Sequence, residues 1–537
     1  MTMARTRSTV AAAILSALVL LTSVLPGQTT SQTAAVEAAV RDATVLVTGA
    51  LDDVAAAVTD AGGRVVGHLP LFGTVVAEVP SDGITAIDAV PGVMVTENAP
   101  VQLESAQDSA VEHPADDQGP RTLKAHQLWR DGIDGTGIGI AVLDTGVSEV
   151  DELAGRVVGG VDLTWEQDGV DSYGHGTPVA SLAAGSTTGV APGAHVVPVK
   201  IAGEDGMTDI ARLLIGLDWI ARHAGEYDIR VVNLSLGSTP IAVDLVDAAV
   251  QRLWDLGLVV VVAAGNDGPD TLGTPAGNTH VITVGATQGQ DTKSINDDVI
   301  APWSANGVDV DGNAKPDVVA PGQSVVAAGS IGSWAYDEHP EGHLGDGLQR
   351  VSGTSFSTGL VSGAAALILD AHPDWTPDEV LGQLVETGRR TTGTDAPTPR
   401  LHRAVDTTSP VVANGDASET TEAALQELMD LGPPDPITLF TAVGDVASVF
   451  ELGSGWYGSG WYGSGWYETD WFGSGWYGSG WYGSGWYGSG WYGSGWYGSG
   501  WYGSGWYGSG WYGSGWYGSG WYGSGWYGSG WYGAGWA

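Results

Sequence analysis

Between residues 121 and 408, short apolar runs alternate with stretches of helical periodicity. The runs are rich in β-branched residues and include IGIAVLD (138–144), HVVPVKI (195–201), IRVVNLSLG (229–237), LVVVVAAGN (258–266) and HVITVGA (280–286). Helical patterns at 208–223 and 241–257 separate some of them. Continuous apolar strands of this kind are buried on both faces, and the intervening helices cover those faces. The sequence therefore predicts an α/β unit with a parallel sheet and helices on both faces.

Four short motifs place polar side chains where strands end or helices begin. Asp144 ends the first run, within LDTG, and Asn266 ends the fourth, within AAGN. His175 lies between glycines in YGHGTPVAS, and Ser355 lies in GTSFSTG ahead of an apolar helical run. Each motif also has an ordinary structural interpretation, because Asp is common in turns and Ser or Thr often caps a helix. The carboxyl ends of parallel strands are nevertheless where such sheets bind ligands.

Together, in the order Asp, His, Ser, these motifs resemble the subtilisin-like serine proteases, or subtilases. The segments GVAPGAHVVPVKI, NLSLG and KPDVVAPG match the same family, and the resemblance covers residues 121–408. It implies a serine endopeptidase that hydrolyses peptide bonds through an acyl-enzyme. Ser355 would be the nucleophile, His175 the general base and Asp144 the group that orients it, while the Asn266 side chain would donate to the oxyanion.

The resemblance also implies how a polypeptide substrate binds. The segment Ser235, Leu236, Gly237 would form an edge strand that pairs with the substrate backbone, and AGEDGM (202–207) would supply the opposite edge. Gly237, Ala263, Ala264 and Gly265 would line the main specificity pocket. Small residues there predict an open pocket that accepts a large apolar side chain.

Two positions depart from the family pattern. Pro178 stands where the family usually has His; in a first helical turn proline removes a donor that has no intrahelical partner, so we expect no loss of activity. Gly359 stands where the family usually has Pro, and glycine costs a helix about 1 kcal/mol relative to Ala.

The chemistry requires no cofactor, and the sequence predicts no catalytic metal. Residues 309–317, DVDGNAKPD, space their oxygens somewhat like a calcium loop but lack the terminal Glu. The family's usual metal-free turn is the favoured interpretation here. A structural calcium ion elsewhere in the fold stays an alternative.

The N-terminal region predicts a secreted precursor. Arg5 and Arg7, the apolar stretch 11–25 and the small residues after it are typical of a signal peptide over residues 1–35, with an uncleaved anchor as the alternative. Residues 36–104 have the order β-α-β-β-α-β, a split βαβ unit, and resemble the family's inhibitory propeptide. Residues 105–120 form a polar linker, and we expect self-cleavage within 104–120. The chain has no cysteine, which suits a bacterial exported protein without disulfides.

The C-terminal region changes character twice. Residues 409–452 read as a linker, and from 453 to 537 the pentad Gly-Ser-Gly-Trp-Tyr repeats with little variation. A period of five suits neither a helix nor a strand, which favours a flexible aromatic segment over a small stacked solenoid. Its role is open between a spacer, attachment to cell-wall polysaccharide and self-association. The protein would then be extracellular or associated with the cell envelope.

The net charge and the presence of all four candidate site residues further restrict the possible functions. With 20 basic and 62 acidic residues the net charge is −42, which argues against a nucleic-acid partner. One rival function is a binding or surface protein whose protease fold is inert or serves only its own release. Another is a processing protease for one secreted partner. The intact set of Asp144, His175, Ser355 and Asn266 favours an active enzyme.

Overall fold

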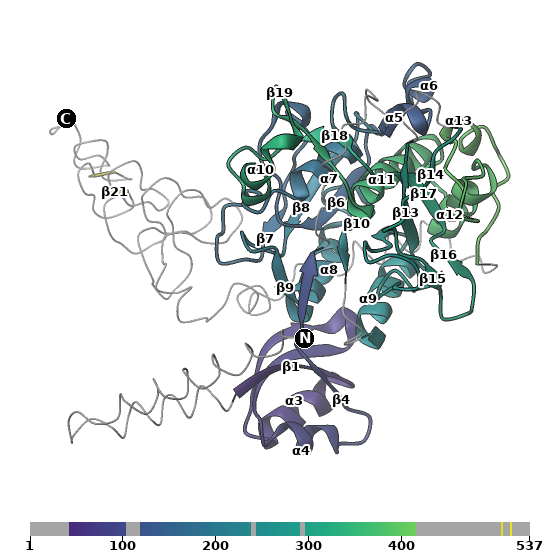
Figure 1. Ribbon diagram of the computed structural model, residues 1–537. Coiled ribbons are helices and arrows are strands. Elements are labelled where there is room, and N and C mark those ends of the chain that lie inside the picture. Colours follow the sequence, from purple (N-terminus) through teal and green to yellow (C-terminus); the bar gives the residue numbers. More distant parts are fainter. Residues whose placement is uncertain are drawn as a thin grey trace, which may run out of the picture. The chain divides into compact units, whose positions relative to one another are not determined.

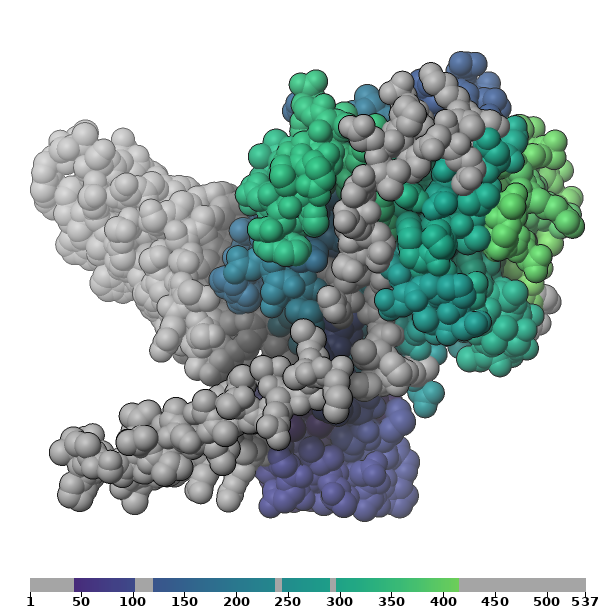
Figure 2. All heavy atoms as spheres, in the orientation of Figure 1, coloured from purple at the N-terminus to yellow at the C-terminus, as the bar shows by residue number. Residues whose placement is uncertain are grey.

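The computed structural model describes residues 42–103, 119–237, 243–289 and 296–414, together with 506–507 and 516–517. The chain divides into two compact units, Met1–Asn98 and Ala99–Ala537 (Figure 1). Figure 2 shows the same parts in space-filling form. The predicted signal peptide, nearly all of the linker predicted over residues 105–120 and most of residues 409–537 lie outside the described residues.

The first unit is a four-stranded antiparallel sheet with two helices. Its strands run in the order β2-β3-β1-β4. The elements are β1 (Asp42–Thr48), α3 (Leu51–Asp60), β2 (Arg64–Leu69), the short helix η1 (Pro70–Phe72), β3 (Thr74–Pro80), α4 (Ile84–Asp88) and β4 (Met94–Glu97). Alternate residues of β1 and β3, such as Val45, Val47 and Val75, share a core with Val54 and Val58 of α3. This order of strands and helices is a split βαβ arrangement.

The second unit is built on a large, mainly parallel sheet. Its order is β14-β13-β12-β10-β6-β8-β7, and β17 also pairs with β13. Only the β13–β14 pair is antiparallel. The strands are β6 (Gly139–Asp144), β7 (Val161–Asp162), β8 (His195–Lys200), β10 (Ile229–Leu234), β12 (Val259–Ala263), β13 (Ile282–Gln288), β14 (Val299–Ile300) and β17 (Val318–Pro321). The central strands are buried along their length, because helices flank the sheet. The predicted α/β fold is confirmed.

Within the described part of the chain, five longer helices pack around this sheet; one contains Ser355, and His175 immediately precedes another. The helices are α7 (Gly176–Ala184), α8 (Ile210–His223), α9 (Val243–Asp255), α11 (Thr354–Ala371) and α12 (Pro377–Glu386). α7 contacts α11, and α8 contacts α9. Among the described residues, α11 is the one helix long and apolar enough to cross a membrane; it is 89% buried inside the unit, as a core helix would be.

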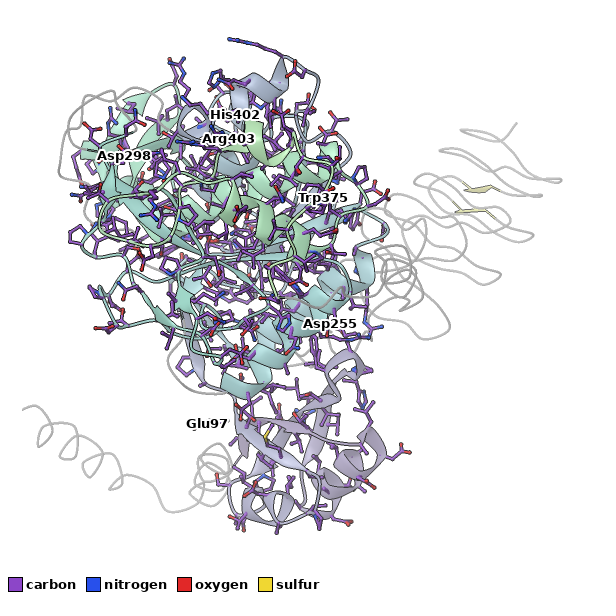
Figure 3. All side chains as sticks on the ribbon, turned by 90° about the vertical axis from the view of Figure 1, so that its right-hand side faces the viewer. Glu97, Asp255, Asp298, Trp375, His402 and Arg403 are labelled. Atoms are coloured by element: carbon purple, nitrogen blue, oxygen red, sulfur yellow. The ribbon has the colours of Figure 1, made fainter. Side chains whose placement is uncertain are left out.

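Smaller elements complete the second unit. They are α5 (Gly119–Thr122), α6 (Ala125–Trp129), η2 (Asp151–Leu153), the hairpin β15 (Gly307–Val308) and β16 (Ala314–Lys315), the strands β18 (Val325–Ala328), β19 (His343–Gly345) and β20 (Leu348–Val351), α10 (Trp334–Glu338), η3 (Pro340–Gly342) and α13 (Leu401–Ala404). After α11, Trp375 stacks on His372 with ring centroids 3.9 Å apart, and Figure 3 labels Trp375.

The repeat region contributes one described pair of strands. β21 (Trp506–Tyr507) pairs in parallel with β22 (Trp516–Tyr517), so that Trp506 lies opposite Trp516. The partners are separated by two pentads of the sequence. The predictions made for the rest of the repeat fall outside the described residues.

Candidate active site

A carboxylate and an imidazole form a buried pair at the end of β6. His175 Nδ1 lies 2.8 Å from Asp144 Oδ1 and 3.0 Å from Oδ2. The side chains are 2% and 0% exposed, so water scarcely screens the pair. The backbone N–H of Thr145 also donates to Asp144 Oδ1 at 2.7 Å. With its Nδ1 proton held by the carboxylate, the imidazole keeps Nε2 as its basic nitrogen.

The glycine after His175 allows this pair to form. α7 begins at Gly176, and a Cβ at this position would overlap the carbonyl oxygen of Gly146 in the loop after β6. Only glycine lets the first turn of α7 pass this close to that loop. The close approach brings His175 to the carboxyl end of β6, where Asp144 lies.

Ser355 lies in the first turn of α11, next to Phe356, whose ring faces His175. The ring of Phe356, the next residue, has its centroid 5.4 Å from that of His175. Ser355 is 1% exposed, and its Oγ has no hydrogen-bond partner among the described residues. The hydroxyl of Ser235 donates to the Ser355 carbonyl at 3.2 Å, which fixes the backbone of this turn. First-turn amides of a helix have no intrahelical acceptor, so the Ser355 N–H can serve an anion.

Asn266 is oriented by the residue before Ser355. Its Oδ1 accepts from the Thr354 N–H at 2.9 Å and from Thr354 Oγ1 at 3.0 Å. Thr354 Oγ1 in turn accepts from the Gly265 N–H at 3.2 Å. Oδ1 therefore faces the first residue of α11, and the Nδ2 amide group points away from these two donors. Asn266 is thus held against Thr354, the residue that precedes Ser355.

A peptide strand already lies between the two edges of the site. β5 (Pro100–Leu103) is the middle strand of a three-stranded antiparallel sheet, between β11 (Leu236–Gly237) and β9 (Met207–Asp209). Leu103 lies opposite Leu236, and Gln102 lies opposite both Gly237 and Met207. Val101 in this strand is 3% exposed. The second unit therefore binds an extended segment of its own chain by strand pairing.

Comparison with known proteins agrees with this geometry. The Subtilase family profile matches residues 135–409. The chain belongs to the subtilase family. It is 36% identical over 276 residues to serine protease AprX of Bacillus subtilis (strain 168), covering 48% of this chain and 62% of that protein.

Two further relatives are serine proteases by name. The extracellular serine proteinase of Thermus sp. (strain Rt41A) is 33% identical over 318 residues, which are 58% of this chain and 70% of that protein. Subtilisin BL of Lederbergia lenta is 33% identical over 262 residues, which are 48% of this chain and 85% of that protein. The peptidase unit of this subtilase is thus a subtilisin-like serine endopeptidase domain.

The structure of this subtilase corrects one predicted edge. The opposite edge was expected at residues 202–207, but the strand runs from Met207 to Asp209. Residues 203–206 form a turn instead, in which the Gly206 N–H donates to the Gly203 carbonyl at 3.0 Å. Gly206 ends this turn with a φ of +67°, a left-handed conformation that glycine adopts without steric cost.

Three of the predicted pocket residues, Ala263, Ala264 and Gly265, lie at the end of β12, and the fourth, Gly237, lies in β11. Ala263 and Ala264 are buried, and the Ala264 N–H donates to Val284 at 3.0 Å. The Gly265 carbonyl accepts from the Ala305 N–H at 2.9 Å. These bonds fix the segment that leads into Asn266. That this segment lines the main specificity pocket for a substrate side chain stays a prediction.

The loop at residues 309–317 is held by its own hydrogen bonds. Asp309 Oδ1 accepts from the N–H groups of Asp311 and Asn313, and its Oδ2 accepts from Asn313 Nδ2 at 2.9 Å. Lys315 Nζ lies 2.7 Å from Asp317 Oδ2. The Lys315 ammonium group lies beside the Asp317 carboxylate, and the Asp309 oxygens already accept hydrogen bonds from the loop. These contacts do not favour calcium binding by either carboxylate. Within the described ranges, no group of three or more potential metal ligands gathers.

Sequence reasoning missed two buried residues next to the pair. Asp171 and Thr145 contact the backbone around His175, and both are buried. The signal was an acidic residue shortly before the His-Gly motif, in DSYGHG (171–176). An aspartate in a glycine-rich loop resembles an ordinary turn residue, so the sequence alone did not distinguish it.

Proposed function

We propose that this subtilase is a secreted serine endopeptidase that uses Ser355, His175 and Asp144 as its catalytic triad. The observation that carries the proposal is the buried bond of 2.8 Å between His175 Nδ1 and Asp144 Oδ1, beside the first turn of α11 that contains Ser355. A serine hydroxyl is a poor nucleophile until a base takes its proton. An imidazole oriented by a buried carboxylate is such a base.

The reaction proceeds in two halves. His175 Nε2 takes the Ser355 proton as Oγ attacks the substrate carbonyl carbon, and Asp144 stabilises the imidazolium that forms. The Ser355 N–H and Asn266 Nδ2 donate to the oxyanion of the tetrahedral intermediate. His175 then gives its proton to the leaving amine, and the C–N bond breaks to leave an acyl-enzyme. Water, activated by the same imidazole, hydrolyses the ester and restores the Ser355 hydroxyl.

Substrate polypeptides would bind as β5 does, between β9 and β11. Main-chain hydrogen bonds to these edges give affinity with little demand on sequence. Ser235, Leu236, Gly237, Ala263, Ala264 and Gly265 would form the edge strand and the main pocket. The pocket residues Gly237, Ala263, Ala264 and Gly265 are all small, which supports a preference for a large apolar side chain.

The protein would be made as a precursor that cleaves itself. β5 pairs with β11 and β9, the edges proposed to bind substrate, and the chain continues from Leu103 into the predicted cleavage region 104–120. The split βαβ unit before β5 would act as the intramolecular inhibitor. A strand that fills both edges of the cleft excludes other polypeptides until it is cut and released.

Export and attachment complete the proposal. The signal-peptide pattern of residues 1–35 supports secretion, as does the similarity to the extracellular serine proteinase of Thermus sp.. Aromatic faces stack on sugar rings, so the Trp-Tyr repeat would hold the enzyme on cell-wall polysaccharide. A structural calcium ion stays a proposal without a located site.

The test of the proposal is hydrolysis of casein by the secreted protein, with and without a serine-directed phosphonate. We expect hydrolysis that the phosphonate abolishes, and no hydrolysis by Ser355→Ala. A protein that folds and matures but leaves casein and a panel of unrelated proteins intact would favour the rival binding function. Cleavage of only one secreted partner would favour the processing protease.

A further inference from the structure

Asp171 is a buried carboxylate that accepts hydrogen bonds from the turn carrying His175. Its Oδ1 accepts from the Gly174 N–H at 2.7 Å and the His175 N–H at 3.3 Å, and its Oδ2 accepts from the Thr177 N–H at 2.8 Å. The side chain is 1% exposed. One carboxylate therefore accepts hydrogen bonds both from the backbone at Gly174 and His175 and from the first turn of α7.

Thr145 joins this carboxylate to the catalytic one. Its hydroxyl donates to Asp171 Oδ1 at 2.6 Å, and its oxygen accepts from the Gly176 N–H at 2.9 Å. Its backbone N–H donates to Asp144 Oδ1 at 2.7 Å. The contacts form a closed ring that runs from Asp144 through His175 and Asp171 to Thr145 and back to Asp144.

The ring is anchored beyond the site as well. The Asp171 carbonyl accepts from Ser330 Oγ at 2.8 Å, and the Asp171 N–H donates to Ser148 Oγ at 3.2 Å. Burial raises the pKa of Asp171, while the hydrogen bonds from Thr145, Thr177 and Gly174 act in the opposite direction. Burying a carboxylate is costly unless its oxygens are fully bonded. This buried carboxylate lies at the turn that carries His175.

We propose that Asp171 is a positioning residue that, through Thr145 and the 174–177 turn, fixes the orientation of His175 relative to Asp144 and Ser355. The inference rests on the proposed role of His175 as the general base. A displacement of about 1 Å in a catalytic group can reduce the rate by roughly 10²-fold. Substrate binding uses β9 and β11, which Asp171 does not contact through any described hydrogen bond, so its loss acts on kcat rather than KM.

The test compares Asp171→Asn with the wild type on a chromogenic peptide. The amide has nearly the same shape but offers one acceptor atom in place of two, so at least one backbone N–H meets another donor. We expect kcat to fall by roughly 10- to 100-fold at unchanged KM. The rate of labelling by the phosphonate should fall by a similar factor.

Glu152→Gln is the matched control at the other end of α7. The Glu152 carboxylate accepts from the Thr187 N–H at 2.8 Å, from Thr187 Oγ1 at 2.6 Å and from the Thr188 N–H at 3.1 Å, in the loop that follows the helix. Burial opposes ionisation of Glu152, but these bonds outweigh it and lower its pKa. We expect Glu152→Gln to lower the thermal midpoint and to leave kcat unchanged. An equal loss of kcat in both variants at an equal loss of midpoint would overturn the proposal.

A second pair of variants decides the question if Asp171→Asn does not fold. Thr145→Val removes the hydroxyl that links the two carboxylates, and Thr145→Ser keeps it. The proposal requires a low kcat for Thr145→Val and a near wild-type kcat for Thr145→Ser; normal kcat in both would contradict it. His175→Ala is measured alongside, because retained activity in that variant would refute the triad itself, whatever Asp171 does.

Discussion

Gly359 of α11 lies against the backbone of α7, where a Cβ would come 2.7 Å from the carbonyl oxygen of Val179. Ser355 lies one helical turn before Gly359, and His175 lies one turn before Val179. We therefore expect the crossing of the two helices to set the separation of Ser355 and His175, the proposed nucleophile and base. The departure from the family at Gly359, which weakens the helix by propensity, has a packing reason.

Gly359→Ala should lower both stability and activity. The added methyl meets a backbone oxygen that cannot rotate away, so the helices must separate, at a cost of about 1–3 kcal/mol. We expect kcat to fall because Ser355 and His175 move apart, and we expect KM to change little. Gly277→Ala is the control, since a Cβ there has its nearest neighbour at 3.8 Å. Wild-type kcat in a folded Gly359→Ala protein would show that the helix crossing does not set the geometry.

Asn266→Ala should reduce kcat at nearly constant KM. The variant removes the amide that we propose donates to the oxyanion, and loss of such a donor in subtilisin itself is known to cost about 10²–10³-fold. Asn266→Asp keeps the oxygen that accepts from Thr354 and removes the donor, so it should fold normally and still lose kcat. Steady-state kinetics with one peptide substrate measure both. Full activity in Asn266→Asp would remove Asn266 from the oxyanion site.

Asp247→Asn should stabilise the protein at neutral pH and not near pH 4. Burial raises the pKa of Asp247 to about 6, helped by the charge of Asp244 and opposed by Asn278. Its Oδ1 is buried without a hydrogen-bond partner among the described residues. Because the folded chain holds this proton more tightly than the unfolded chain, whose pKa is about 3.9, stability falls as pH rises from about 4 to 6.

The asparagine side chain cannot ionise, so Asp247→Asn does not lose folding stability as the pH rises over this range. Allowing for solvent around a half-buried group, we expect a gain of about 1 kcal/mol at pH 7. Chemical denaturation at pH 4 and pH 7 measures it, with exposed Asp131→Asn as the control. Equal effects of Asp247→Asn at both pH values would rule out the titration as the cause.

Ser355→Ala should accumulate as an uncut precursor. A chain that cleaves itself needs its own nucleophile, so in a protease-free host the variant keeps β5 joined to the peptidase unit. Mass spectrometry of the wild type should place the new N-terminus within 104–120. Normal maturation of Ser355→Ala would show that another protease does the cutting.

The repeat region should bind cell-wall polysaccharide independently of catalysis. Incubation of full-length Ser355→Ala with purified cell wall, followed by centrifugation, should place the protein in the pellet. A chain that ends at residue 414 is the control and should stay in the supernatant. Full recovery of the long chain in the supernatant would leave the spacer function or self-association.

The sequence predicted the sheet correctly and marked the candidate site residues, because both leave local signals. Buried parallel strands are continuous apolar runs, and Asp144, His175 and Asn266 follow or precede such runs in short motifs. The sequence did not reveal what depends on tertiary contacts. The capping of His175 by Asp171 crosses a loop, the need for Gly359 comes from another helix, and the β9 edge at Met207–Asp209 depends on pairing with β5. Local patterns carry no information on such contacts, so these residues looked like turn formers or weak helix formers.

The most direct test of the account is to map the phosphonate adduct on the mature protein by peptide mass spectrometry. The triad predicts one adduct per chain, on Ser355, with labelling abolished in His175→Ala although that variant keeps the hydroxyl. An adduct on another residue, or equal labelling of His175→Ala, would contradict the assignment of Ser355 as a nucleophile activated by the His175–Asp144 pair.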